Sequence, residues 1–99
     1  MIQILWEYTV KPEQAINFES HYASRGDWAL LFQKSPAYRG TVLLRDTATP
    51  HRYVTIDVWS DRAAYEAFRR EHTAEYEKID RLCAEFTTEE RCLGIFEVV

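Results

Sequence analysis

Two acidic residues lie inside segments whose other side chains mark them as β-strands. Glu7 belongs to the first of these segments and Asp57 to the third. Acidic residues are depleted in strands, so each calls for an explanation. If the two share a face that lines a cavity, loss of water raises their carboxyl pKa values and makes one of them a general base. If that face opens to water, we expect an ion pair with Arg45 or Arg52 instead.

His72 is the other candidate base. It lies on an apolar stripe, with Phe68 four residues before it and Tyr76 four residues after it, so a helix would turn the imidazole toward the sheet. A histidine in an apolar pocket can act as a base near neutral pH or bind a metal. The alternative is a structural role, in which the imidazole forms a hydrogen bond with a backbone carbonyl.

Aromatic residues could form the walls of a pocket. Trp59 ends a predicted strand, where a large aromatic side chain either lines a pocket or fills the core. His21 and Trp28 could together form one wall, although His21 also fits a boundary position at the edge of its helix. Tyrosine hydroxyls could bind a carbonyl or phenol oxygen of a ligand, and the candidates for this role are Tyr8, Tyr65 and Tyr76.

Composition and missing motifs exclude several function classes. The chain has 99 residues and a net charge of −4, so it lacks the basic face that nucleic-acid binding requires. No phosphate-binding glycine loop, zinc-protease helix motif or nucleophile elbow occurs. Cys83 and Cys92 lack the close spacing of a zinc pair or a redox motif, which favours two reduced thiols in a cytoplasmic protein.

The beginning of the chain reads as a strand. The segment MIQILWEYTV lacks the charged start and the small-residue cleavage site of a signal peptide. No apolar run approaches the roughly 20 residues that cross a bilayer. We therefore expect a cytoplasmic protein without a membrane partner.

Hydrophobic periodicity predicts the order strand, helix, strand, strand, helix, strand. The predicted strands cover residues 2–10, 38–46, 52–59 and 91–99. The predicted helical segments cover residues 12–24, a short second piece at 28–33 and one long helix at 61–84. Asp27 and Ser60 are the expected N-caps of the last two. No repeat or linker divides the chain, so residues 1–99 form one domain.

This order around a central hairpin predicts an α+β domain of the ferredoxin-like βαββαβ kind. Right-handed crossovers then place both helices on one face of a four-stranded antiparallel sheet. Leu5 falls on the opposite face, and one side of the strand at 52–59 is wholly aliphatic, so the uncovered face is not purely polar. A symmetric homodimer with the two sheets facing each other would cover it. The alternative is a monomer with an amphipathic open face.

Nearly the whole chain resembles the antibiotic biosynthesis monooxygenase (ABM) domains of the dimeric α+β barrel group. The segments that carry the resemblance are Lys11-Pro12-Glu13, Phe18 to Tyr22, Gly40, Leu43 to Asp46, His51 to Trp59 and Ser60 to Phe68. The resemblance implies a homodimer with a pocket between sheet and helices in each protomer. It also implies cofactor-independent oxygenation of a small aromatic or quinol-type compound, as in characterised relatives.

Other relatives degrade haem, and here the sequence departs from them. Those members pair a first-strand Asn and a strand-three Trp with a His on the second helix. Trp59 matches the tryptophan, but Glu7 lies near the place of the Asn, and His72 follows Trp59 at too great a distance. We therefore expect no haem and no resident cofactor. Flavin or NAD(P)H supplied from outside stays an open alternative.

Two functions follow from these observations. In the first, His72 or Asp57 removes a phenolic or activated C–H proton, and the electron-rich product reduces oxygen in an aromatic pocket. Residues expected to bind this substrate are Tyr8, His21, Trp28, Trp59 and Tyr76. In the second, the protein is a non-catalytic dimer that binds a small apolar molecule or serves as an accessory subunit. Convergence of His72, Asp57 and Trp59 on one cavity would favour the enzyme.

Overall fold

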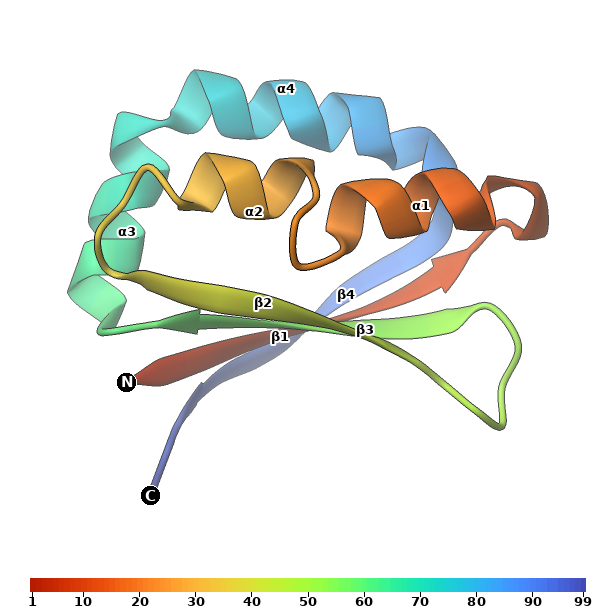
Figure 1. Cartoon of the computed structure of the whole chain (residues 1–99), viewed down its shortest axis with the longest axis horizontal. Helices are drawn as coiled ribbons and strands as arrows, with labels where there is room; N and C mark the ends of the chain where they lie inside the picture. Colours follow the sequence, from red (N-terminus) through yellow and green to blue (C-terminus); the bar gives the residue numbers. More distant parts are fainter.

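Alternating side chains build a four-stranded antiparallel sheet in the order β2-β3-β1-β4. The strands are β1 Ile2–Val10, β2 Tyr38–Arg45, β3 Arg52–Trp59 and β4 Thr87–Glu97. The computed structural model describes all 99 residues. All its helices lie on one side of the sheet (Figure 1), so the predicted ferredoxin-like fold is confirmed.

Short helices make up the covering layer. They are η1 Pro12–Gln14, α1 Ala15–Tyr22, α2 Asp27–Phe32, α3 Arg62–Glu71, α4 Thr73–Cys83 and η2 Ala84–Phe86. Pro12 begins the first crossover, where its missing N–H and fixed φ suit the first helical turn. None of these helices has the length and apolar character that a membrane crossing requires.

The long helix predicted at 61–84 is interrupted. His72 leaves helical geometry, with φ −118° and ψ 30°, and divides the segment into α3 and α4. The Thr73 hydroxyl donates back to the carbonyl of Arg69 at 2.8 Å, a local hydrogen bond that bends helices. Hydrophobic periodicity continues through the break, which is why the sequence predicts one helix.

The N-caps of α2 and α3 each lie one residue away from the predicted N-caps. Asp61, not Ser60, caps α3, because its carboxylate accepts a hydrogen bond from the Ala64 backbone N–H at 2.8 Å. Asp27 is the first residue of α2, and Gly26 occupies the N-cap. A Cβ at Gly26 would lie 2.4 Å from the carbonyl oxygen of His21, so only glycine fits this turn.

β4 begins at Thr87, before the predicted start at residue 91. Its first half is polar, so hydrophobic alternation does not reveal it. Backbone pairing with β1, which extends to Val10 opposite Thr87, defines this half of the strand instead.

An aromatic core fills the space between sheet and helices. Trp59 and Phe18 are completely buried in it. Phe18 stacks on Tyr22 at 4.2 Å and meets the edge of Tyr8 at 5.2 Å, so α1 and β1 share one aromatic cluster. The other buried members include Ile2, Ile4, Val10, Trp28, Leu31, Phe32, Tyr53, Phe68, Cys83 and Phe86.

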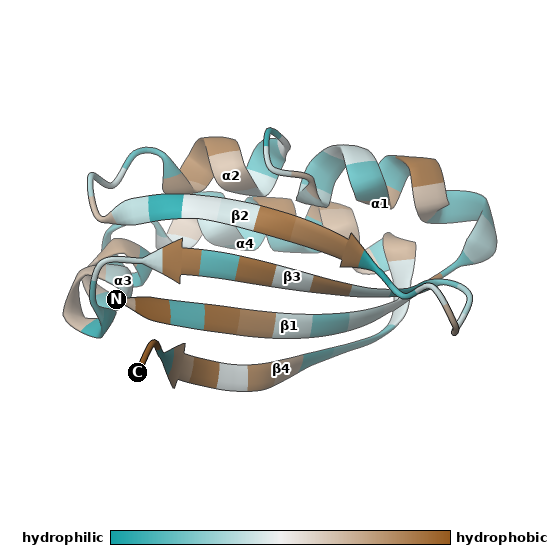
Figure 2. Cartoon of the chain, turned by 60° about the horizontal axis from the view of Figure 1, so that its bottom comes forward, coloured by the Kyte–Doolittle hydropathy of each residue, from teal (hydrophilic) through white to brown (hydrophobic).

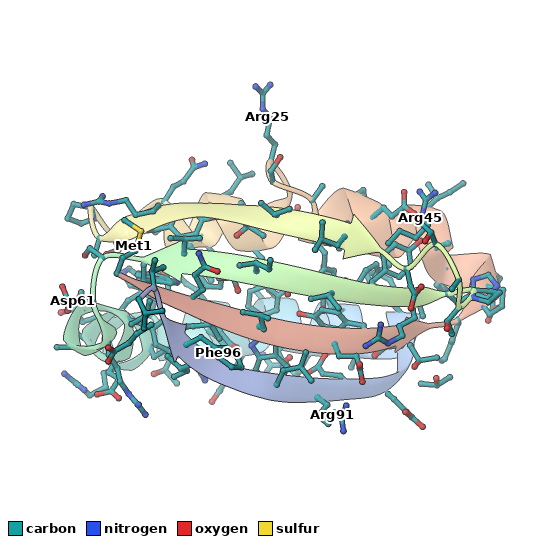
Figure 3. The ribbon with its side chains drawn as sticks, turned by 90° about the horizontal axis from the view of Figure 1, so that it is seen from below. Met1, Arg25, Arg45, Asp61, Arg91 and Phe96 are labelled. Carbon is teal, nitrogen blue, oxygen red and sulfur yellow. The ribbon has the colours of Figure 1, made fainter.

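The opposite face of the sheet has no helix over it (Figure 2). Strand register places Leu5 and Val42 on either side of Ile56 there, and Val54 faces Leu44. Val42, Leu44 and Phe96 are about half exposed. Figure 3 shows this face from outside, with Phe96 and Arg91 both on β4. The predicted uncovered apolar face is therefore present.

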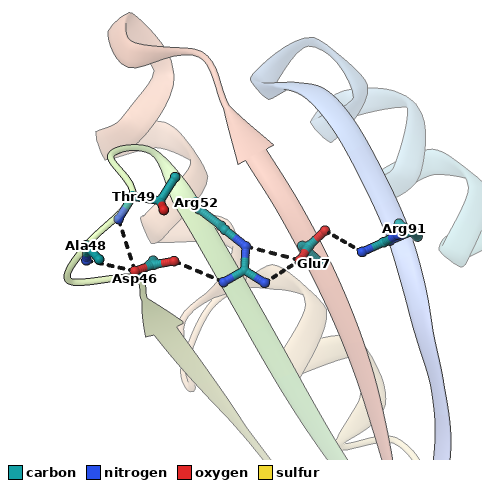
Figure 4. A network of polar contacts seen from close by, with 6 residues as sticks. All are labelled: Glu7, Asp46, Ala48, Thr49, Arg52 and Arg91. Carbon is teal, nitrogen blue, oxygen red and sulfur yellow. Dashed lines mark hydrogen bonds and ion pairs between the residues drawn. The ribbon is translucent and has the colours of Figure 1, made fainter.

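A network of polar side chains lies beside the apolar residues on this open face of the sheet (Figure 4). Glu7 accepts hydrogen bonds from Arg52 on β3 and, at 3.0 Å, from Arg91 on β4. Arg52 also donates to Asp46 at 3.0 Å, and Asp46 caps the β2–β3 turn by accepting from the backbone N–H of Ala48. The hydrogen bond from Arg52 lowers the pKa of Glu7.

Three register shifts interrupt the alternation of the edge strands; one lies between Thr9 and Val10 in the β1–β4 pair, and the other two are β-bulges that contain a glycine. In β2 the register shifts between Tyr38 and Gly40, and in β4 Leu5 pairs with Gly94 while Trp6 pairs with Cys92. Both glycines have positive φ, 132° and 144°, which L-residues rarely adopt. Because of the first bulge, the side chains of Tyr38 and Thr41 point to the same face of the sheet, although they are three residues apart. The second turns Glu90 toward the helices and Arg91 toward Glu7.

Candidate functional site

One cavity lies between the sheet and the helical layer. Its lining comes from all four strands and from α1, α2 and α4, and consists of Trp6, Tyr8, Tyr22, Trp28, Phe32, Thr41, Thr55, Asp57, Tyr76, Asp80 and Glu90. The lining combines six aromatic side chains with three carboxyl groups and two threonine hydroxyls. No lysine, arginine or histidine contributes to it.

Asp57 occupies the sheet wall of this cavity. β3 places its half-buried side chain opposite Thr41 on β2 and Ile4 on β1. Burial removes water from the carboxylate and raises the pKa of Asp57 to about 6, while the hydrogen bond from the Thr41 hydroxyl at 2.6 Å acts in the opposite direction. A carboxyl group with this pKa is largely ionised at pH 7 and more basic than an exposed aspartate.

Two further hydroxyls adjoin Asp57 on the same wall. The phenol of Tyr8 and the hydroxyl of Thr55 are buried and 3.0 Å apart. Burial raises the pKa of Tyr8 far above its ordinary value, so this phenol stays protonated. The pair can therefore offer a neutral hydroxyl, but not a charge, to a bound molecule.

The opposite end of the cavity is acidic. Asp80 on α4 and Glu90 on β4 both line it. Burial raises the pKa of Glu90, and the negative charge of Asp80 raises it further. Arg69 lies outside the lining, with its guanidinium 3.8 Å from the ring centroid of Tyr76.

Aromatic rings form the helical wall. Trp28 meets Tyr76 edge-to-face at 4.8 Å and lies 5.8 Å from Phe32. The indole N–H of Trp28 is buried beside the Tyr22 hydroxyl and the Cys83 thiol.

The cavity is narrow in this conformation. Its volume is about 40 Å³, enough for a few water molecules. Drug-sized ligands occupy roughly 300–1,000 Å³. An aromatic molecule therefore fits only if lining side chains move, and Trp6 and Tyr76 are the least buried of the aromatic ones.

His72 lies outside this cavity, contrary to its predicted orientation. Its Nδ1 is 2.8 Å from a carboxylate oxygen of Glu75, and its ring stacks on Phe68 at a centroid distance of 4.6 Å. The cause is the helix break at this residue, which removes His72 from the stripe that Tyr76 continues. The structure thus gives His72 a local ion-pairing partner and no access to the aromatic walls.

The other predicted site residues divide into two groups. Tyr8, Trp28 and Tyr76 line the cavity as expected. Trp59 is completely buried beside Phe32, Tyr38, Tyr65 and Phe68 and does not reach the cavity. Of the three residues whose convergence would favour the enzyme, only Asp57 therefore lines the cavity. His21 also lies outside, because its Nδ1 is 2.8 Å from the Asn17 carbonyl and its ring packs on Phe86.

Glu7 and Asp57 do not share a face, contrary to the sequence-based interpretation. Register pairs Glu7 with Val54 and Asp57 with Ile4, so one carboxylate lies on the open face and the other on the cavity side. For Glu7 the ion-pair alternative is confirmed, with Arg52 as its partner.

Several lining residues were not singled out from the sequence. Strand alternation places Trp6 on the same face as Tyr8, and Thr55 on the same face as Asp57. This pattern could have identified Trp6 and Thr55 from the sequence. Glu90 gave no such signal, because its orientation depends on the bulge before Gly94. Tyr22, Phe32, Thr41 and Asp80 come together only through packing of separate elements.

The lining does not suit haem. It contains no histidine to ligate the iron, and burial raises the pKa values of all three lining tyrosines, Tyr8, Tyr22 and Tyr76, which disfavours phenolate ligands. No group of three or more His, Cys, Asp or Glu side chains has the arrangement of a metal site.

Solved structures with the same fold include a cofactor-independent oxygenase. A variant of SnoaB, a cofactor-independent oxygenase from Streptomyces nogalater, is 24% identical with a TM-score of 0.77, covering 98% of this chain and 91% of that one. A proposed antibiotic biosynthesis monooxygenase from Bordetella bronchiseptica is 21% identical with a TM-score of 0.76, covering 99% and 96% of the two chains. At these identities the likeness establishes the fold.

A proposed monooxygenase of the same kind from Nitrosomonas europaea is 16% identical with a TM-score of 0.72, over 100% and 99% of the two chains. No curated protein sequence matches the chain. The family model described as antibiotic biosynthesis monooxygenase matches residues 1–82, which include three of the four strands and most of the cavity lining. The chain therefore belongs to the antibiotic biosynthesis monooxygenase family.

Proposed function

We propose that this protein is a cofactor-independent monooxygenase that acts on a small aromatic or quinol-type compound, with Asp57 as the general base. The observation that carries this proposal is a carboxylate with a raised pKa on the wall of an aromatic cavity. A base whose pKa lies near the working pH combines ionisation at neutral pH with useful proton affinity.

The reaction we propose begins with proton transfer. The Asp57 carboxylate takes a proton from an activated methylene or phenol of the substrate, and the resulting carbanion gives electrons to O₂. A C–O bond forms, and Asp57 returns its proton to the peroxide oxygen, which gives a hydroperoxide. The O–O bond then breaks as the second C–H bond is lost and C=O forms. The leaving hydroxide takes the proton of that C–H bond and departs as water. The methylene loses four electrons and O₂ gains four, so no external reductant is consumed.

The surrounding groups support this chemistry in different ways. Trp28, Phe32 and Tyr76 offer apolar surface for a planar substrate. The neutral hydroxyls of Tyr8 and Thr55 offer hydrogen bonds beside the base. A substrate that fills the narrow cavity would exclude water from the carbanion.

Oxygen uptake with anthrone, which carries an activated methylene, tests this proposal. The rate without protein is subtracted, and the purified protein receives no flavin, haem or metal. We expect D57N to lower turnover by about 100-fold or more, the usual effect of losing a general base. His72→Ala is the matched control, because His72 was the competing base by sequence and lies outside the cavity. Turnover that survives in D57N but not in the His72 variant would overturn the assignment of the base.

The same assay separates the enzyme from the alternative binding function. A non-catalytic binding protein would bind anthrone, seen as quenching of tryptophan fluorescence, without consuming oxygen. Activity that appears only after addition of flavin and NAD(P)H would contradict cofactor independence while leaving the cavity as the site.

A further inference from the structure

We propose that Thr41 and Tyr38 are positioning residues that orient the Asp57 carboxylate and connect it to the edge of the sheet by a hydrogen-bonded relay. The relay deepens the proposed function, because it acts on the base assigned there. It is carried by the geometry of three side chains from two strands.

The relay has two short hydrogen bonds. Thr41 Oγ1 donates to Asp57 Oδ1 at 2.6 Å. The Thr41 hydroxyl has a single proton, so the Tyr38 hydroxyl, 2.5 Å away, must donate to Thr41 whenever Asp57 is ionised. The three groups therefore form one directed chain from Tyr38 through Thr41 to the carboxylate.

The β2 bulge makes this chain possible. Residues three apart in a regular strand point to opposite faces. The extra residue at Arg39 and the positive φ of Gly40 bring Tyr38 and Thr41 to the same face, opposite Trp59 and Asp57 respectively. Since β2 is an edge strand and Tyr38 is half-buried, the relay runs from the buried carboxylate toward the outside of the molecule.

The relay has two consequences for a base. It occupies Oδ1 and leaves Oδ2, which receives no hydrogen bond from another side chain, as the oxygen that takes the substrate proton. When Asp57 is protonated, the proton lies on Oδ2 and Thr41 goes on donating to Oδ1. The relay therefore holds the carboxyl group in one orientation while Oδ2 takes the substrate proton and returns it.

Thr41 is also the group that favours the charged form of Asp57. The titratable groups around the cavity are Tyr8 from β1, Tyr22 from α1, Tyr76 and Asp80 from α4, and Glu90 from β4, with Tyr38 beside Thr41 on β2. None of them is a cation. Removal of the Thr41 hydroxyl should therefore raise the pKa of Asp57.

A carboxyl-carbon NMR titration measures this pKa without reference to activity, and D57N identifies the Asp57 signal. We expect T41V to raise the pKa by about one unit, since hydrogen bonds to charged groups contribute about 1.5–3 kcal/mol. Thr41→Ser keeps the donor and should stay near wild type. A pKa raised by one unit would lower turnover about fivefold at pH 6, because fewer Asp57 side chains are ionised there. At pH 8 turnover would hardly change, because Asp57 is ionised in both proteins.

A double-mutant cycle tests the connection to Tyr38. Y38F should raise the pKa of Asp57 by less than T41V does, and the T41V/Y38F double variant should match T41V alone, because Tyr38 acts through Thr41. Additive shifts, or an unchanged pKa in a folded T41V protein, would overturn the relay. If the pKa values shift as expected and the wild type never consumes oxygen, the relay stands and the oxygenase proposal fails.

Discussion

At the residue scale, the Asp57 carboxylate lies where burial disfavours its charged form. Its pKa of about 6 in the folded protein exceeds the ordinary value of 3.8, so the folded state binds more protons than the unfolded state between about pH 4 and pH 6. Stability contributed by this group therefore falls as pH rises through that window. The buried carboxylate therefore lowers the free energy of unfolding at neutral pH.

We predict that D57N stabilises the protein at pH 7.5, by up to about 3 kcal/mol from two pKa units. The advantage should vanish at pH 4, where the carboxyl of the wild type is protonated in the folded state. Urea unfolding at the two pH values measures both quantities. D80N is the matched control, because Asp80 borders the same cavity but is exposed, and it should change stability little. Equal stability of D57N and wild type at pH 7.5 would show that the carboxylate is better solvated than its position indicates.

Sequence reasoning found part of this site and missed part of it for physical reasons. Tyr8 and Asp57 were predictable, because strict alternation fixes which side chains of a strand share a face. His72 was misplaced because a helical pattern cannot reveal where the backbone leaves the helix. Thr41 carried no signal, since a threonine in a strand is ordinary and its importance depends on its neighbours across β2 and β3.

At the element scale, the N-cap of α3 shows how one side-chain hydrogen bond determines where a helix begins. D61A should cost about 1 kcal/mol of stability, because it removes the hydrogen bond to the Ala64 N–H. S60A should cost much less, since the Ser60 hydroxyl reaches only the Asp61 side chain. Thermal unfolding of the two variants measures the difference. A larger effect from S60A would reassign the cap to the residue that the sequence favoured.

The elements themselves were predictable to different degrees. β3 has the bounds that the sequence predicted, because its alternation is unbroken from Arg52 to Trp59. The β4 boundary was wrong, because residues 87–90 are polar and are held by pairing with β1. The bulge at Gly40 was also hidden. A glycine in a strand suggests an irregularity, but not which side chains it turns.

At the scale of the whole molecule, the open face of the sheet calls for a partner. Leu5, Ile56, Val42 and Leu44 form an apolar patch there, bounded by the Glu7–Arg52–Arg91 network. We propose that two copies bury this face against each other, as expected from the sequence. The charged network at one end of the patch would then sit at the rim, where it restricts how the two sheets can align.

Ile56→Asp tests this assembly, because it places a carboxylate in the middle of the patch. We expect wild type to be a dimer and the variant a monomer at micromolar concentration, since an unpaired buried charge costs several kcal/mol. Light scattering coupled to size-exclusion chromatography measures the mass. Leu82→Asp on the exposed side of α4 is the control and should remain a dimer. A monomeric wild type would leave the open face unexplained by self-association.

The bulge in β4 has a consequence for how relatives of this protein could diverge. If Gly94 were replaced by a residue that enforces regular pairing, counting back from Leu5 would place Arg91 opposite Tyr8, where Glu90 now stands. The cavity would exchange an acid for a guanidinium although neither residue had mutated. One glycine codon could thus reverse the charge preference of the site, and comparison of residue types at aligned positions would not detect the change.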